Sequence, residues 1–195
     1  MVPFIGLTGG IGVGKSEALA ALGRLGAAVL STDAVVHQLY ESDEVRDEVA
    51  ARFGPDVVKD GVVDRSAVAQ HAFASAEDRE WLESILWPRV GARMSEWRLE
   101  MGARTPPPPA TVVEVPLLFE SGMDAVFDAT IAVLAPEQLR TQRAGARGHA
   151  ALQERGARQL APDEKAARAT YVVDNDGTIE ELEQKLSAIL DKLQG

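Results

Sequence analysis

Five short apolar runs that do not alternate with polar residues recur along this chain. They lie at residues 4–7, 27–30, 111–115, 130–134 and 170–173. Unalternating runs of this length are typical of strands that are buried on both faces of a parallel sheet. The pattern therefore predicts an α/β fold with a doubly wound, parallel five-stranded sheet.

Segments with helical spacing separate these runs, and several carry start or stop signals. Gly26 closes the first helix, and Thr178 with Glu181 three residues later forms a capping box for the last one. Thr105, followed by four prolines at 106–109, ends a long helical block because proline cannot continue a helix. The predicted helical segments are 15–25, 33–104, 136–168 and 179–193.

The length of 195 residues is that of one domain with inserted parts. The proline run marks the return from a helical insertion to the sheet, and a basic helical segment follows the fourth apolar run. We therefore divide a single domain into three parts, listed here by residue number: a core (1–40, 110–138 and 169–195), a helical insertion (41–109) and a basic segment (139–168).

A complete G-x-x-x-x-G-K-S/T motif stands between the first apolar run and the first helix, at residues 9–16. In such a phosphate-binding loop (P-loop), successive backbone N–H groups converge on phosphate oxygens at the positive end of a helix. Lys15 would reach the outer phosphates, and the Ser16 hydroxyl can ligate Mg²⁺. The residues whose backbone would form the cradle are Gly10, Ile11, Gly12, Val13 and Gly14. The motif predicts a site for nucleotide phosphates.

A dinucleotide-binding unit is the rival interpretation of this loop, because Asp33 lies about twenty residues downstream, where such units place an acid. The glycine spacing excludes it. Gly10, Gly12 and Gly14 do not form G-x-G-x-x-G, and a dinucleotide loop has no use for the following Lys-Ser pair.

Charge and composition narrow the function further. Thirty acidic and twenty basic residues give a net charge of −10, which argues against broad contact with nucleic acid. Basic residues nevertheless outnumber acidic ones between Leu139 and Arg168, which indicates either a solvated helical face or a local phosphate clamp. The absence of cysteine, of a signal peptide and of a membrane-length apolar stretch predicts a cytoplasmic protein with no membrane partner.

Two carboxylates are candidates for chemistry at the ends of apolar runs. Asp33 follows the second run and either caps the helix at 34–40 or acts as a general base toward an attacking hydroxyl. Glu114 lies near the end of the third run, where an acid beside a P-loop often helps to hold Mg²⁺.

Longer motifs point to one family. The chain reads Gly-Leu-Thr-Gly-Gly-Ile-Gly at 6–12, Asp-Gly-Val-Val-Asp-Arg at 60–65, Val-Pro-Leu-Leu-Phe-Glu at 115–120 and Val-Asp-Asn-Asp-Gly at 173–177. Together with the pair Arg143 and Arg147, these motifs run nearly from end to end. The chain resembles the bacterial dephospho-CoA kinases, P-loop kinases that phosphorylate the ribose 3′-hydroxyl of dephospho-CoA with ATP.

The resemblance implies a nucleotide core, a CoA-binding insertion at 41–109 and a mobile lid at 139–168, in a chain that we expect to be monomeric. It implies that Asp33 is the catalytic base. Lys15 and the loop amides would hold the ATP phosphates, Ser16 would hold Mg²⁺, and Arg143 with Arg147 would neutralise the transferred phosphoryl group. Positions implied to contact a substrate are Asn175 for the adenine and, for the acceptor, Asp33, Arg65, Leu117, Leu118, Phe119 and Glu120.

The chain departs from the family pattern on the acceptor side. Ser31-Thr32-Asp33 stands where the family usually has Asp-Ala-Asp, and Trp87-Pro88 stands where it commonly has His-Pro. These departures leave open a related small-molecule or nucleotide kinase with a changed acceptor. A third alternative is a non-catalytic P-loop protein, since residues 174–177 spell D-x-x-G, although no guanine-reading N-K-x-D is present.

Overall fold

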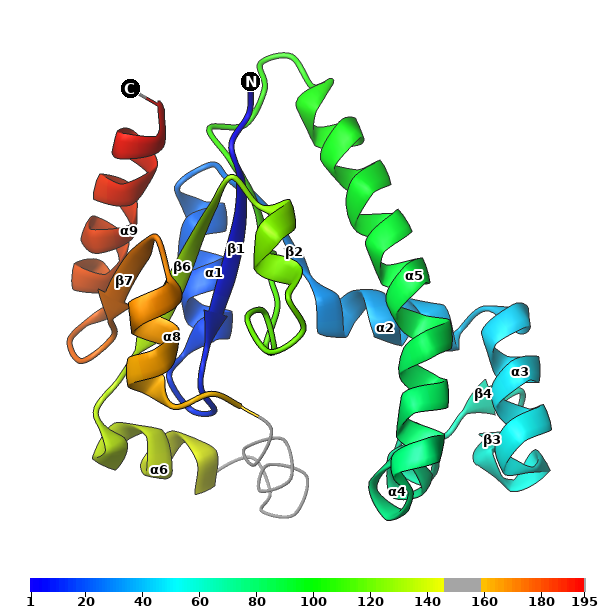
Figure 1. Cartoon of the computed structure of the whole chain (residues 1–195). Coiled ribbons are helices and arrows are strands. Elements are labelled where there is room, and N and C mark those ends of the chain that lie inside the picture. The colour runs from blue at the N-terminus through cyan, green and yellow to red at the C-terminus, as the bar shows by residue number, and fades with distance from the viewer. Residues whose placement is uncertain (146–158, 195) are drawn as a thin grey trace. The chain divides into compact units, whose positions relative to one another are not determined.

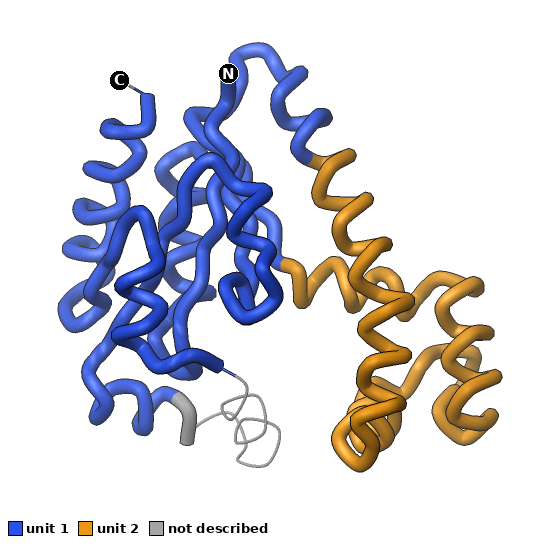
Figure 2. Tube along the Cα trace, in the orientation of Figure 1, with its two compact units in different colours: residues 1–31, 98–195 blue, residues 32–97 orange. Residues whose placement is uncertain are grey.

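The computed structural model describes residues 1–145 and 159–194, in which helices flank a sheet and a separate group of helices carries a small hairpin (Figure 1). The chain forms two compact units (Figure 2). Unit 1 comprises Met1–Ser31 and Arg98–Gly195, and unit 2 comprises Thr32–Trp97. Residues 32–40, which we assigned to the core, belong to unit 2. Our division into core, insertion and lid stays a prediction.

Unit 1 is built on a parallel five-stranded sheet of order β2-β5-β1-β6-β7. Its strands are β1 (Phe4–Gly9), β2 (Ala28–Ser31), β5 (Thr111–Glu114), β6 (Ala129–Leu134) and β7 (Tyr171–Asp174). The five apolar runs thus form the five strands, and the predicted fold class is confirmed. Because β1 is central, the loop that follows it opens at the middle of the sheet's carboxyl edge, where ligands bind in such folds.

Helices cover both faces of this sheet (Figure 1). α1 (Lys15–Arg24) and α9 (Ile179–Gln194) share one hydrophobic core with the strands, to which Leu22 and Leu186 contribute fully buried side chains. α8 (Pro162–Arg168) contacts β1 and β6. Each fully buried leucine contributes roughly 1.5–3 kcal/mol to the free energy of folding, so packing on the sheet stabilises these helices.

The last helix begins as its sequence predicts. Thr178 N donates to Glu181 Oε2 at 2.9 Å, and Glu181 N donates to Thr178 Oγ1 at 3.2 Å. The capping box is therefore confirmed. α6 (Glu137–Gly145) and α8 occupy the ends of the single helical block predicted at 136–168, and the residues between 146 and 158 lie outside the described part of the chain.

Unit 2 contains α2 (Thr32–Tyr40), α3 (Asp43–Phe53), α4 (Arg65–Ala74) and most of α5 (Ala76–Gly102). It also contains a hairpin of β3 (Val58–Lys59) and β4 (Val62–Val63), where we expected only helices. The turn residues Asp60 and Gly61 both have positive φ, +52° and +78°. This is the conformation of a two-residue hairpin turn, which Asp-Gly favours and which overrides the helical pattern locally.

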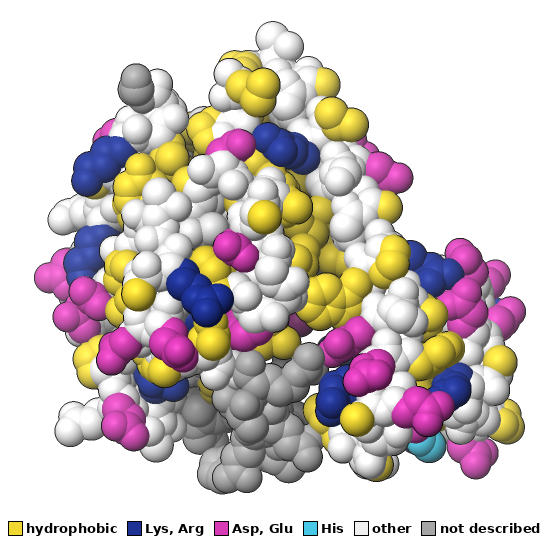
Figure 3. Space-filling view, viewed as in Figure 1, with side chains coloured by type: hydrophobic (Ala, Val, Ile, Leu, Met, Phe, Trp, Pro, Cys, Tyr) yellow, Lys and Arg dark blue, Asp and Glu magenta, His cyan; other side chains and the backbone are white. Residues whose placement is uncertain are grey.

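Short 3-10 helices, Pro55–Val57 and Met123–Val126, complete the described elements of the two units. The face drawn in Figure 3 carries interspersed acidic and basic side chains, without an extended basic patch among its described residues. No helix within 1–145 or 159–194 is long and apolar enough to span a membrane.

Candidate active site

The P-loop joins β1 to α1 and requires glycine at two positions. Gly12 and Gly14 have φ of +76° and +92°, a region that other residues rarely adopt. A side chain on Gly12 would also collide with the backbone oxygen of Arg140, and one on Gly14 with the side-chain amide of Asn175. Both glycines are needed for the path of the loop and for its packing against residues far along the chain.

Side chains hold the loop by its carbonyl groups. Lys15 Nζ donates to Gly10 O at 3.0 Å, and Arg140 Nε donates to Ile11 O at 3.3 Å. Val13 O accepts from Asn175 Nδ2 at 2.8 Å and from Arg143 Nη1 at 3.4 Å. Three successive features of the predicted site (the loop, Arg143 and Asn175) therefore lie together in unit 1.

The loop ends at the N-terminus of α1, whose first two residues are Lys15 and Ser16. Gly14 precedes the helix and offers no side chain to cap it, so first-turn N–H groups remain available to an anion. Ser16 is exposed at this positive end of the helix. The arrangement can bind an anion with several oxygen atoms.

Glu114 ends β5, the strand between β2 and the P-loop strand β1. It is buried, 7% exposed, and its Oε2 accepts a hydrogen bond from Ser31 Oγ at 2.8 Å. Parallel register aligns Glu114 with Leu7 on one side and with Ser31 on the other. The carboxylate therefore lies at the carboxyl edge that also carries the P-loop.

The donor set fits Mg²⁺, because the Ser16 hydroxyl and the Glu114 carboxylate are the hard oxygen ligands that this ion prefers. Within the described residues, no group of three or more His, Cys, Asp or Glu side chains could hold a metal by itself. Mg²⁺ in nucleotide sites usually keeps several water molecules and shares phosphate ligands, so it needs few protein ligands.

The four residues of the motif at 117–120 differ in their burial. Leu118 is fully buried and packs against Gly6, and Phe119 is 5% exposed, so in this structure both belong to the core of unit 1. Leu117 and Glu120 are partly exposed. Of the four residues in this motif, these two offer side-chain surface to an acceptor.

Glu120 is engaged by Lys165, which is completely buried on α8. Lys165 Nζ lies 2.8 Å from Glu120 Oε1 and donates to Pro116 O at 3.0 Å and to Thr8 Oγ1 at 3.4 Å. Leu160 N donates to the same Glu120 oxygen at 2.8 Å. Burial alone would raise the pKa of Glu120, but these hydrogen bonds outweigh it and hold the pKa below its ordinary value.

Two predicted residues belong to unit 2. Asp33 is the exposed second residue of α2, which begins at Thr32 and not at residue 34, so Asp33 lies in the first turn and not at the N-cap position. Arg65 begins α4, and its Nη1 lies 2.5 Å from His37 Nδ1. Burial raises the pKa of the nearby Tyr40 hydroxyl to about 12, and the positive charge of Arg65 lowers that pKa by a smaller amount. Arg147, the remaining predicted site residue, lies outside the described residues.

Sequence reasoning gave Arg140 and Lys165 no individual role in the site. Arg140 could have been found, because it lies three residues before Arg143 and shares its face of the helix. Lys165 matches the family pattern, but the charged residues Asp163, Glu164 and Arg168 on α8 predict an exposed lysine, so no local pattern indicated its burial.

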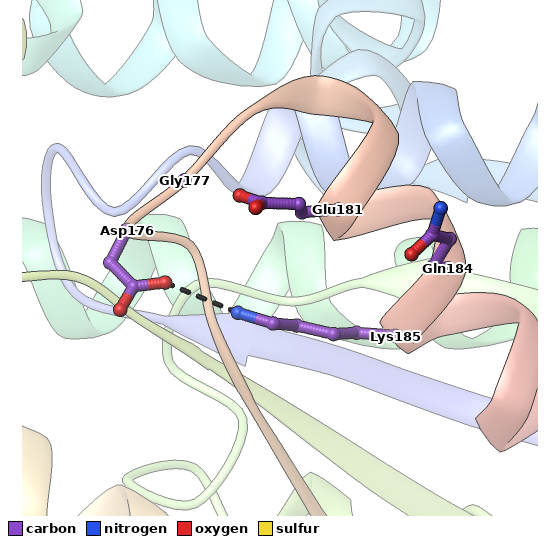
Figure 4. A pocket seen from close by; sticks show the side chains of 5 residues that line it. All are labelled: Asp176, Gly177, Glu181, Gln184 and Lys185. Atoms are coloured by element: carbon purple, nitrogen blue, oxygen red, sulfur yellow. Dashed lines mark hydrogen bonds and ion pairs between the residues drawn. The ribbon is translucent and has the colours of Figure 1, made fainter.

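A separate open hollow lies beside the start of α9 (Figure 4), and its lining residues are Asp176, Gly177, Glu181, Gln184 and Lys185. Lys185 Nζ donates to Asp176 Oδ1 at 3.1 Å and to the backbone oxygen of Asp174 at 2.6 Å. The hydrogen bond to the Lys185 ammonium lowers the pKa of Asp176. Because these groups pair with one another and Glu181 caps α9, the hollow has a structural explanation.

Comparison with known proteins identifies the family. A sequence profile described as dephospho-CoA kinase matches residues 3–181. The chain belongs to the dephospho-CoA kinase family. It is 41% identical to the dephospho-CoA kinase of Deinococcus radiodurans, across 97% of this chain and 92% of that protein. The resemblance that the sequence motifs indicated is thereby confirmed.

Solved structures share the fold of this chain. The crystal structure of TT1252 from Thermus thermophilus is 36% identical, with a TM-score of 0.81 over 100% of this chain and 99% of that one. Dephospho-CoA kinase from Campylobacter jejuni shares the fold, with a TM-score of 0.72 at 22% identity over 100% of this chain and 98% of that one. Its family makes this chain a kinase, and its fold is that of the P-loop kinases.

Proposed function

We propose that this chain transfers the γ-phosphoryl group of ATP to the ribose 3′-hydroxyl of dephospho-CoA, giving CoA and ADP. The observation that carries the proposal is an intact P-loop, held by its carbonyl groups, in a chain that matches the dephospho-CoA kinase profile over residues 3–181. Phosphoryl transfer needs alignment and charge neutralisation, which such a loop supplies.

The donor would be held by unit 1. The backbone N–H groups of the P-loop and the Lys15 ammonium would bind the β- and γ-phosphates, and Arg143 and Arg147 would neutralise charge on the transferred group. Ser16 and Glu114 would hold the Mg²⁺ that accompanies ATP, and the ion would neutralise phosphate charge. Lys15 donates to Gly10 O in this structure, so its ammonium would exchange that carbonyl for a phosphate oxygen.

The acceptor side would use Asp33 as general base. The 3′-oxygen attacks the γ-phosphorus, the bond from phosphorus to the β–γ bridging oxygen breaks, the hydroxyl proton passes to the Asp33 carboxylate, and ADP leaves. Arg65, Leu117 and Glu120 would contribute to binding dephospho-CoA. We further expect a cytoplasmic monomer without nucleic-acid or membrane partners.

A kinase with a changed acceptor is the competing proposal. It rests on Trp87, which stands on α5 in place of the family's usual histidine and is 36% exposed. An indole offers a flat apolar surface where an imidazole would offer a hydrogen bond. The two proposals share the donor site and differ only in the acceptor.

Turnover with a panel of acceptors separates them. Purified protein would be given Mg²⁺-ATP with dephospho-CoA, adenosine, AMP, CMP or shikimate, with ADP release followed and each product identified by mass. We expect selective conversion of dephospho-CoA to CoA, abolished in Lys15→Ala and retained in Lys192→Ala, a change of an exposed lysine on α9. Turnover with another acceptor alone would establish the competing proposal.

A further inference from the structure

The direction of each P-loop carbonyl group determines the direction of the following N–H group. A peptide bond is planar and trans, so the carbonyl of one residue and the N–H of the next point in opposite directions. A side chain that fixes the Ile11 carbonyl therefore fixes the direction of the Gly12 N–H. In the same way, a side chain that fixes the Val13 carbonyl fixes the Gly14 N–H.

Asn175 is built to hold the second of these peptides. It is 6% exposed, its backbone N donates to Leu134 O at 2.8 Å, and its Nδ2 donates to Val13 O at 2.8 Å. A carbonyl oxygen only accepts, so the amide nitrogen must face it. The same nitrogen packs directly on Gly14, and no side chain could fit between them.

Arg140 holds the first peptide from α6. Its Nε donates to Ile11 O at 3.3 Å, and its own backbone lies against Gly12. Its guanidinium lies 3.5 Å from the point where a Cβ on Gly10 would stand, which places it over the start of the loop. Arg140 thus contacts the loop with both its side chain and its backbone.

From this geometry we propose that Asn175 and Arg140 are positioning residues of the P-loop, which aim the Gly14 and Gly12 amides at the nucleotide phosphates. The inference deepens the proposed function and rests on its use of the loop to bind a triphosphate. It also reassigns Asn175. Its side chain acts through the loop, and the adenine contact that the family resemblance implies is not its main role.

The sharpest probe is inorganic tripolyphosphate, which carries the phosphates of ATP without a base. Binding of ATP and of tripolyphosphate would be measured by calorimetry for wild type, Asn175→Leu, Asn175→Ala and Arg140→Gln. Losing one charge-directed or buried hydrogen bond weakens binding by roughly tenfold. We expect each variant to lose affinity for both ligands by about the same factor.

Gln142→Ala is the matched control, because Gln142 is exposed on the same helix as Arg140. Thermal unfolding would be recorded for every variant. Arg140 is only partly buried, so Arg140→Gln carries the test by itself if the Asn175 variants fail to fold. A variant that merely destabilises the fold would lower the unfolding midpoint without changing affinity at a temperature where it is folded.

Two results would overturn the inference. A loss of affinity for ATP alone in the Asn175 variants would make Asn175 a contact to the base, and unchanged affinity for both ligands would leave the carbonyl contacts without effect. Neither result depends on the acceptor, since dephospho-CoA is absent from the titration. Failure of the proposed acceptor would instead appear as wild-type protein that binds tripolyphosphate but does not convert dephospho-CoA.

Discussion

Asp33 is the residue on which the proposed chemistry depends most. Replacing it by Asn keeps its size and removes the proton acceptor, so we expect kcat to fall by about 10²–10⁴ while the KM for ATP changes little. Steady-state kinetics with dephospho-CoA would measure both values. Asp56→Asn, which alters another exposed carboxylate of unit 2, should retain wild-type activity. An unchanged kcat in Asp33→Asn would remove Asp33 from the mechanism.

Ser31 shows how one departure from the family pattern is accommodated. Its hydroxyl donates to the buried Glu114 carboxylate, where an aspartate would bring a second negative charge. Ser31→Ala leaves that carboxylate without this donor and should lower the free energy of unfolding by about 1–3 kcal/mol. Urea unfolding would measure the change, with Ser31→Thr as the control that keeps a hydroxyl. Equal stability of Ser31→Ala and wild type would mean that the bond contributes nothing.

At the scale of elements, the Lys165 ammonium group on α8 makes polar contacts with residues of the sheet and of the segment after β5. Lys165 joins the ends of β1 and β5 through Thr8, Pro116 and Glu120. Removing one partner of a buried ion pair costs about 3–5 kcal/mol, whereas replacing both by apolar residues is often nearly neutral. We therefore expect Lys165→Met to destabilise the protein strongly and Lys165→Met/Glu120→Leu to recover most of that loss. Denaturant unfolding of all four members of the cycle tests this, and additive effects would contradict it.

The same pair predicts a dependence of stability on pH. Hydrogen bonds from Lys165 and Leu160 outweigh the effect of burial and hold the pKa of Glu120 below its unfolded value. The resulting stabilisation is complete above the unfolded carboxyl pKa, about 4.3, and is lost as pH falls through the lower folded value. Unfolding midpoints recorded from pH 6 down to about 3 should therefore fall less steeply in Glu120→Gln than in wild type. Parallel curves would show that Glu120 is not linked to folding.

At the scale of the whole molecule, nucleotide binding should stabilise the folded chain. A ligand at about one hundred times its Kd adds roughly 2.7 kcal/mol when it binds only the folded state. Mg²⁺-ATP should raise the unfolding midpoint of wild type. It should raise that of Lys15→Ala much less, because the proposed contact of the ammonium with the phosphates would be lost. Differential scanning calorimetry with and without Mg²⁺-ATP measures this. An equal rise in both proteins would place the nucleotide away from the P-loop.

Most of the fold of unit 1 could be predicted from the sequence. The five strands, the P-loop and the capping box at Thr178 depend on residues that are close together in the chain, so periodicity and spacing report them. The hairpin of β3 and β4 was missed, although Asp60-Gly61 is the strongest short-range signal for such a turn. Family motifs then indicated the acceptor that no local pattern could specify.

The set of elements and the chemistry of the loop follow from the sequence, because residues that are neighbours in the chain specify both. Only the tertiary structure decided which distant side chains complete the site. Arg140 and Asn175 reach the loop from 129 and 162 residues away, and Lys165 reaches Thr8 from 157. Such contacts depend on the order of the strands, which places β6 next to β1 and β7 next to β6 at the same edge of the sheet. The secondary-structure propensities of single segments do not specify the order of the strands in the sheet.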